Sequence, residues 1–192
     1  MPVNIGSKRQ ADFNDPLGLL TDCHRRIENF VRLLATVTSQ ITEVEPTCVQ
    51  REALETSLRY FRQAAPKHTL DEEESLFPRL CLSQDPRAAA VLGLVQQLST
   101  DHDIADHMHH DIDGLFVRWF VDGTISIDDR HRLTALLGDL SRFYEEHIAI
   151  EEREVFPLAK AILSDEELQL IGKQMADRRG VRFPHAEPAQ ID

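Results

Sequence analysis

One pattern occurs twice, in HTLDEEESLFPRL (residues 68–80) and in HIAIEEREVFPLA (residues 147–159), which share His, two consecutive Glu, Phe and Pro. In each copy the His precedes the first Glu by four residues, so both side chains point to the same side of a helix. A lone His precedes the first copy by 44 residues and the second by 45, at His24 and His102. The chain therefore resembles a duplication of one helical hairpin, with a lone His on one helix and a His/Glu pair on the other.

Apolar residues recur at helical spacing almost throughout the sequence. The spacing and the turn signals predict helices at about 16–41, 47–82 with a kink at Pro66, 87–121 and 128–163. Four long amphipathic helices joined by short links predict an all-α, antiparallel up-down-up-down four-helix bundle over residues 16–163. A capping box that starts at Ser164 predicts a short fifth helix over 164–180. We expect a flexible segment at 1–15 and a loose tail at 181–192.

The composition limits the kinds of partner. The chain has 192 residues and a formal net charge of −12, with 33 acidic residues against 21 Lys and Arg. This excess repels phosphate backbones, so we expect no nucleic-acid binding. No apolar stretch approaches the roughly 20 residues that span a membrane. The start lacks a secretory signal and the three cysteines are far apart, which predicts a reduced, cytoplasmic protein. The sequence gives no oligomeric state.

Ionisable residues occupy the apolar stripe of every predicted bundle helix, although burying an unpaired charge costs several kcal/mol. In an up-down bundle, two positions face each other when they are equidistant from the turn that joins their helices. The midpoints between successive histidines fall at residues 46, 85 and 124–125, all in predicted turns. One level of the bundle should therefore contain His24, His68, His102 and His147 together with Glu72 and Glu151.

This set of side chains predicts a metal site. A single buried His is more often simply hydrogen-bonded in a core, and a single Glu is more often on the surface. Six such residues at one level favour the metal site. The set has no thiolate, which disfavours a closed structural zinc site, whereas imidazole with carboxylate suits iron or manganese. Two ions sharing the site would keep open positions, which indicates O₂, peroxide or NO chemistry.

Over about Leu17 to Leu163 the sequence resembles the haemerythrin-like, or HHE cation-binding, proteins, most specifically in the two H-x-x-x-E-E-x-x-x-F-P segments. The resemblance implies a four-helix bundle around a non-haem di-iron centre, in which an oxo, hydroxo or water bridge joins Fe²⁺ or Fe³⁺ ions and manganese or zinc are substitutes. It also implies the roles of the residues: Glu72 and Glu151 as bridging ligands, and His24, His68, His102 and His147 as terminal ligands.

The sequence departs from the oxygen carriers of this family at two ligand positions. Those proteins have a fifth His one turn after the third-helix ligand, where this chain has Asp106, and a bridging Asp five residues after the fourth-helix His, where it has Glu151 at four. The pattern is closer to family members that resemble iron or oxygen sensors, NO-responsive proteins and iron-cluster repair proteins. We therefore expect a protein that binds or senses O₂, NO or iron in iron metabolism or in nitrosative or oxidative stress.

Four further residues lie near the predicted site. Asp106 is a candidate additional ligand, and Glu28, one turn after His24, lies on the same face. His109 is seven residues from His102, about 10 Å along the helix, which is too far for the same ion pair and favours packing or an access path. Tyr144, one turn before His147, is a candidate hydrogen-bond donor to a bound oxygen ligand.

Two other functions compete with binding or sensing. A di-iron oxidase, peroxidase or ferroxidase is the main rival, although ferritin-like enzymes have Glu where this chain has its lone histidines. The sequence shows no obvious substrate cleft, which favours binding over catalysis. The other rival is a structural adaptor whose metal only holds the bundle together.

Overall fold

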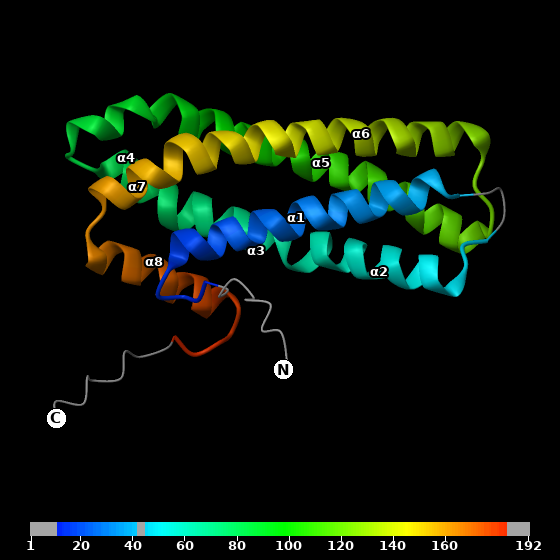
Figure 1. Ribbon diagram of the computed structural model, residues 1–192, viewed down its shortest axis with the longest axis horizontal. Helices are drawn as coiled ribbons and strands as arrows, with labels where there is room; N and C mark the ends of the chain where they lie inside the picture. Colours follow the sequence, from blue (N-terminus) through cyan, green and yellow to red (C-terminus); the bar gives the residue numbers. More distant parts are fainter. Residues whose placement is uncertain (1–10, 42–44, 184–192) are drawn as a thin grey trace, which may run out of the picture.

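The computed structural model describes residues 11–41 and 45–183, and all regular structure in these ranges is helical. Four arms run antiparallel along the long axis of the molecule (Figure 1). The first arm is α1 (Pro16–Ser39), and the third is a 3₁₀ turn η2 (Pro86–Ala90) followed by α5 (Leu92–Asp122). Helix α1 packs against the second and fourth arms, and α5 against the fourth. The predicted all-α four-helix bundle is confirmed.

The second and fourth arms are composite, and they contain the two repeated motifs. The second arm consists of α2 (Cys48–Gln63), α3 (Ala65–Asp71), η1 (Glu72–Leu76) and α4 (Phe77–Leu82). The fourth consists of α6 (Ile127–Ile150), η3 (Glu151–Val155) and α7 (Phe156–Ile162). Each motif therefore passes from an α-helix through a short π-helical segment into a second α-helix.

Local chemistry sets where these arms begin and break. Asp15, Thr47 and Ser126 each accept a backbone N–H of the helix that they precede. Gly123 ends α5 at a φ of +69°, a conformation that is costly for residues with a Cβ. The second arm breaks at Ala64, two residues before the predicted kink residue, because Pro66 has no N–H to continue the helical hydrogen bonds.

The π-helical segments η1 and η3 are not predicted from the sequence. Each closes with a hydrogen bond across five residues, from the N–H of Phe77 to the carbonyl of Glu72 and from the N–H of Phe156 to the carbonyl of Glu151. A proline follows in both motifs, at Pro78 and Pro157, and its ring crowds the preceding turn. The helix accommodates the proline by widening, and the widened turn begins at the motif Glu.

Two apolar clusters fill the bundle, one on each side of the level that holds the histidines. The first contains Ile27, Leu58, Phe116, Trp119 and Leu137 among its members. The second contains Leu20, Leu76, Leu98, Val155 and Met175 among its members. The polar level is therefore enclosed along the bundle axis by two separate hydrophobic cores.

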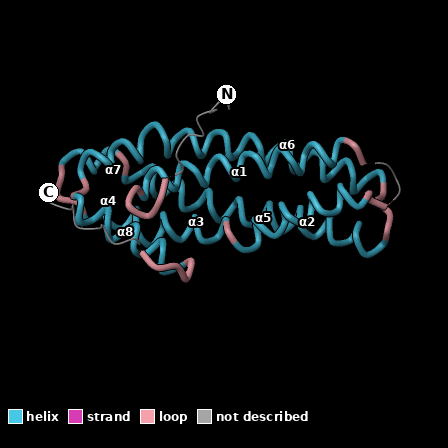
Figure 2. Tube along the Cα trace, turned by 60° about the horizontal axis from the view of Figure 1, so that its bottom comes forward, coloured by secondary structure: helices cyan, strands magenta, loops and turns pink. Residues whose placement is uncertain are grey.

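Helix α8 (Asp165–Arg178) lies outside the four arms, at the same end as α4 and α7 (Figure 2). Its predicted capping box is present, because Ser164 and Glu167 each accept the other's backbone N–H. After the helix, Gly180 has a φ of +64°. Helix α8 packs against α1, α3 and η1, so it contacts the arm that carries the first motif.

Parts of the sequence-based prediction fall on residues that are not described. Residues 1–10 of the predicted flexible segment and 184–192 of the predicted loose tail lie outside the described ranges. Within those ranges, none of the helices combines the length and apolar character needed to cross a bilayer.

Candidate metal centre

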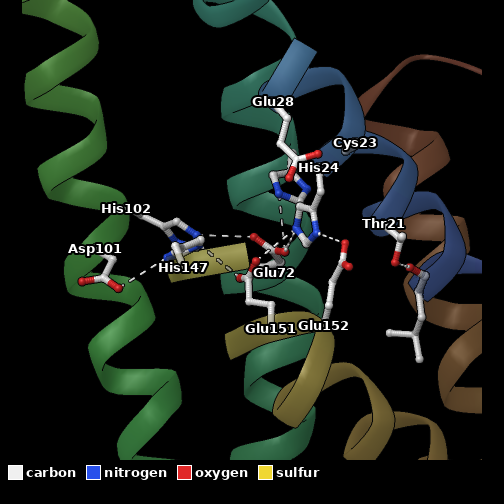
Figure 3. A network of polar contacts seen from close by, with 12 residues as sticks. Thr21, Cys23, His24, Glu28, Glu72, Asp101, His102, His147, Glu151 and Glu152 are labelled. Atoms are coloured by element: carbon white, nitrogen blue, oxygen red, sulfur yellow. Dashed lines mark hydrogen bonds and ion pairs between the residues drawn. The ribbon is translucent and has the colours of Figure 1, made fainter. Parts of the chain in front are cut away.

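The structure brings all six predicted ligand side chains together at one level of the bundle. Figure 3 shows how His24, Glu72, His102, His147 and Glu151 point toward one another there. They form two groups that share Glu151, and within each group one ligand atom per residue lies within 4.8 Å of the others. The first group is His24, His68, Glu72 and Glu151, and the second is His102, His147 and Glu151. The four arms each contribute to this level, because α1, α3 with η1, α5, and α6 with η3 supply these residues.

The two carboxylates lie between imidazoles of different arms. Oε1 of Glu72 is 3.6 Å from Nε2 of His68, and its Oε2 is 3.4 Å from Nε2 of His102. Oε2 of Glu151 is 3.0 Å from Nε2 of His24, and its Oε1 is 3.3 Å from Nε2 of His147. Each carboxylate therefore presents one oxygen to each half of the duplicated chain, which is the arrangement that a bridging ligand requires.

These inner atoms lack hydrogen bonds. Although they lie close to one another as ion-pair contacts, both carboxylate oxygens of Glu72 and Glu151 and Nε2 of His24 and His102 are buried without a hydrogen bond of standard geometry. Buried polar groups without partners carry a large desolvation cost. A cation among them would compensate four carboxylate oxygens and the facing nitrogens together. Nitrogen and oxygen donors of this kind fit iron, manganese or zinc.

A second set of carboxylates, which the sequence analysis did not single out, supports three of the imidazoles from outside. Oε1 of Glu152 is 3.0 Å from Nδ1 of His24, and Oε1 of Glu73 is 2.9 Å from Nδ1 of His102. These two glutamates are the second Glu of each motif, and each supports the lone His of the other half. Their pairing orients the ring and increases the basicity of a metal-ligating His. The repeated Glu-Glu pair was the sequence signal for them.

The outer support is less symmetric for the other two histidines. Oδ2 of Asp101 is 3.4 Å from Nδ1 of His147, whereas Nδ1 of His68 is buried without a partner. Asp101 directly precedes His102, and the matching position before His24 is Cys23, a buried free thiol. The two halves of the duplication therefore differ at this position, because only one of them has a carboxylate there.

The electrostatics of the metal-free protein follow from these contacts. Burial lowers the pKa of His24, but the carboxylates of Glu151, Glu152 and Glu72 raise it well above its usual value. Burial also opposes protonation of His102, while Glu72 and Glu73 raise its pKa to about 9. His68 has no outer carboxylate, and burial lowers its pKa to about 4. Without metal, protons on His24 and His102 therefore partly balance the buried carboxylates.

The additional residues suggested by the sequence lie around this centre. Asp106 is exposed and belongs to neither group. Glu28 is half-buried and contacts Arg25, with 3.3 Å between the carboxylate oxygen and Nη1. Nε2 of His109 is 2.8 Å from the hydroxyl of Tyr144, and the two residues form a separate pair outside both groups.

A cavity of about 300 Å³ opens beside the six residues, and the four histidines and the His109–Tyr144 pair all line it. The sequence alone did not reveal this cavity. The cavity lies between arms that are far apart in the sequence. The periodicity within one helix does not indicate how much space is left between packed helices.

The comparisons with known proteins agree with the geometry. The family model described as the Hemerythrin HHE cation binding domain matches residues 15–159. An uncharacterized protein of Haemophilus influenzae is 28% identical over 172 residues, which cover 90% of this chain and 94% of the relative. The family match covers more than half of the chain and includes all six clustered residues, so the chain belongs to the haemerythrin HHE cation-binding family.

Proposed function

We propose that this protein holds two iron ions in the His/Glu cluster and uses the centre to bind or sense a small ligand, O₂ or NO, or iron itself. One observation carries the proposal: two ligand groups share Glu151, and both inner carboxylates are buried without hydrogen bonds. A site for one ion would not need two bridging carboxylates between four imidazoles.

In this proposal the six clustered residues hold the metal ions, and neighbouring carboxylates orient the imidazoles. Four imidazoles and two bridging carboxylates would fill about eight of roughly twelve positions around two octahedral ions, so open positions remain. Bound iron supplies redox chemistry and affinity for small exogenous ligands at these positions. Glu73 and Glu152 orient the imidazoles of His102 and His24, and the two apolar clusters limit the access of water along the bundle axis.

Binding or sensing is favoured over simple oxygen carriage by the residue at position 106. Oxygen carriers of the family have a fifth His at the position that corresponds to Asp106, and here Asp106 is exposed and outside both ligand groups. With one nitrogen donor fewer, both ions would keep open positions.

Metal analysis tests the proposal directly. The protein purified from its own host should contain about two iron ions per chain, and His68→Ala and Glu151→Ala should each lose at least one. Ferrous protein should change its visible spectrum when NO or O₂ is added under otherwise anaerobic conditions. Retention of a single zinc ion and no iron in the wild-type protein would contradict the proposal.

An oxidase, peroxidase or ferroxidase is the second candidate, and the cavity favours it because a substrate has room beside the centre. Turnover of hydrogen peroxide or ferrous iron well above that of His68→Ala would support an enzyme. Ligand binding without such turnover would favour the binding or sensing protein.

A further inference from the structure

The cavity beside the centre is larger than a diatomic ligand requires. Its volume is about 300 Å³, whereas one water molecule has a share of about 30 Å³ in the liquid. This volume is at the lower end of the range for sites that bind organic ligands. Room for several non-hydrogen atoms therefore lies next to the His/Glu cluster.

The His109–Tyr144 pair gives the cavity a specific polar feature. The two side chains are joined by the 2.8 Å hydrogen bond, and the ring of His109 stacks on Phe61 with 4.1 Å between centroids. Burial lowers the pKa of His109 to about 4 and raises the pKa of Tyr144, so both are uncharged near neutral pH. A hydroxyl can donate one hydrogen bond and accept another, so Tyr144 retains capacity for a guest molecule.

The remaining walls favour an apolar body. Ile27, Phe61, Ala65, Ala105 and Ile148 all line the cavity. Aromatic and aliphatic side chains of this kind make contacts with a ring that do not depend on charge. An uncharged, mainly apolar guest would therefore be desolvated at low cost, while a charged group would lose hydration along the same walls.

Three carboxylates line the cavity together with the cluster imidazoles, and they disfavour an anion next to them. Asp103 and Asp106 are exposed residues that line the cavity, and Glu73 lines it from the facing arm. Negative charge close to a guest raises the free energy of an anion and leaves a neutral molecule unaffected.

We propose that this cavity binds a small uncharged organic molecule with a single hydroxyl group, of the phenol class, and that the hydroxyl bonds to the His109–Tyr144 pair. The ring then lies among Ile27, Phe61 and Ile148, close to the imidazoles of the centre. This assignment goes beyond the proposed iron function. The contacts to the guest come from protein side chains and do not require a bound metal.

Calorimetric titration of the protein as purified tests this site, with phenol as the probe. Toluene has a similar ring without the hydroxyl, and benzoate carries a negative charge, so both should bind at least several-fold more weakly than phenol. Tyr144→Phe should weaken phenol binding about 3- to 10-fold, which corresponds to the loss of one hydrogen bond. Tyr60→Phe is the matched control, because Tyr60 does not line the cavity, and should leave the affinity unchanged.

A second test fills the cavity with larger side chains. Ala105→Leu on α5 and Ala65→Leu on α3 place added atoms on different walls, so either folded variant should weaken phenol binding at least tenfold. No phenol binding by the wild type, equal binding by the filled variants, or tighter binding of benzoate than of phenol would overturn the assignment. Iron content is measured in each sample: wild type that lacks iron but binds phenol contradicts only the proposed function, whereas protein with two irons and no phenol binding contradicts only this inference.

Discussion

Glu73 and Glu152, the second Glu of each repeated motif, support the histidines of the centre from outside. Each lies outside the six clustered side chains, and each contacts Nδ1 of a lone histidine from the other half of the chain. Without such a partner, an imidazole ligand can rotate or expose the wrong nitrogen. The duplication therefore joins its halves through these contacts as well as through the shared carboxylates.

We expect Glu152→Ala to weaken iron binding about 10- to 100-fold, because His24 loses the acceptor that fixes its ring. Glu73→Ala should have a similar effect through His102. Competition with a chromophoric chelator measures both affinities. Glu154→Ala, at an exposed position of the same motif, is the matched control, and an equal loss in that variant would refute this role for Glu152.

The raised pKa values of His24 and His102 predict that metal loading releases protons. At pH 7.5 the imidazole of His102 is protonated in the metal-free protein, since its pKa is about 9, and neighbouring carboxylates also raise the pKa values of His24 and His147. A metal binds only the neutral imidazole, so loading should release at least one proton and affinity should rise with pH. Titrations in buffers of different ionisation enthalpy count these protons. Release of none at pH 7.5 would contradict the assignment.

The shifted pKa values of His102 and His68 predict a stability optimum near pH 6.5 for the metal-free protein. Since the pKa of His102 is about 9 when folded and about 6.5 when unfolded, its stabilisation is complete below pH 6.5 and is lost as pH rises toward 9. The pKa of His68 is about 4 when folded, so stability also falls as pH drops from about 6.5 to 4. Denaturant titrations across this range should show the maximum, and a steady rise to pH 9 would be inconsistent with it.

At the scale of elements, helix α8 is fixed to the first motif by a buried ionic contact. Arg178 Nη1 is 2.9 Å from Oδ1 of Asp71, and Arg179 Nη2 is 2.7 Å from its Oδ2. Arg178 also bonds to Ser75 and Glu74 of η1. Asp71 is fully buried and directly precedes Glu72, so α8 contacts the turn that positions one carboxylate of the cluster.

Asp71→Asn should therefore lower the free energy of unfolding by roughly 2–4 kcal/mol, because two partly buried guanidinium groups lose their charged partner. Urea denaturation measures the change. Asp111→Asn removes one partner of an exposed ion pair with Arg132 and should cost less than about 1 kcal/mol. Equal effects of the two substitutions would show that the α8 contact is not a buried structural link.

The π-helical segments η1 and η3 could not be predicted from the local sequence. Helical periodicity places Glu72 and Glu151 on the inner faces of their arms, and that placement is correct. The widened turns at η1 and η3 depend on how Pro78 and Pro157 are accommodated within a packed helix. A proline can equally end or kink a helix, and only packing with the other arms selects among these outcomes.

For the whole molecule, the two apolar clusters predict how the protein responds to metal removal. They lie on opposite sides of the polar level and consist of separate sets of residues, so we expect each to persist without a metal. Chelation should leave the helical circular dichroism nearly unchanged and lower Tm on the order of 10 °C, as expected for loss of a few kcal/mol of binding free energy. Complete unfolding on chelation would instead support the structural adaptor.

The sequence by itself determined the four-arm bundle and the convergence of six side chains. Helical spacing selects the inward faces, and short links force neighbouring arms to be antiparallel, so positions equidistant from a turn must meet. This is why His24, 44 residues before His68, could be placed beside it without coordinates. The duplicated motif supplied the same geometry for His102 and His147.

The tertiary structure alone decided the contacts that depend on side-chain direction and on space between arms. Glu152 is 128 residues from His24 in the chain, and Arg178 is 107 from Asp71, so no local periodicity relates them. The cavity beside His109 and Tyr144 likewise exists only where several arms fail to fill the volume between them. Spacing along a helix fixes which face a residue occupies, whereas burial, hydrogen-bond pairing and empty volume depend on every arm packed around it.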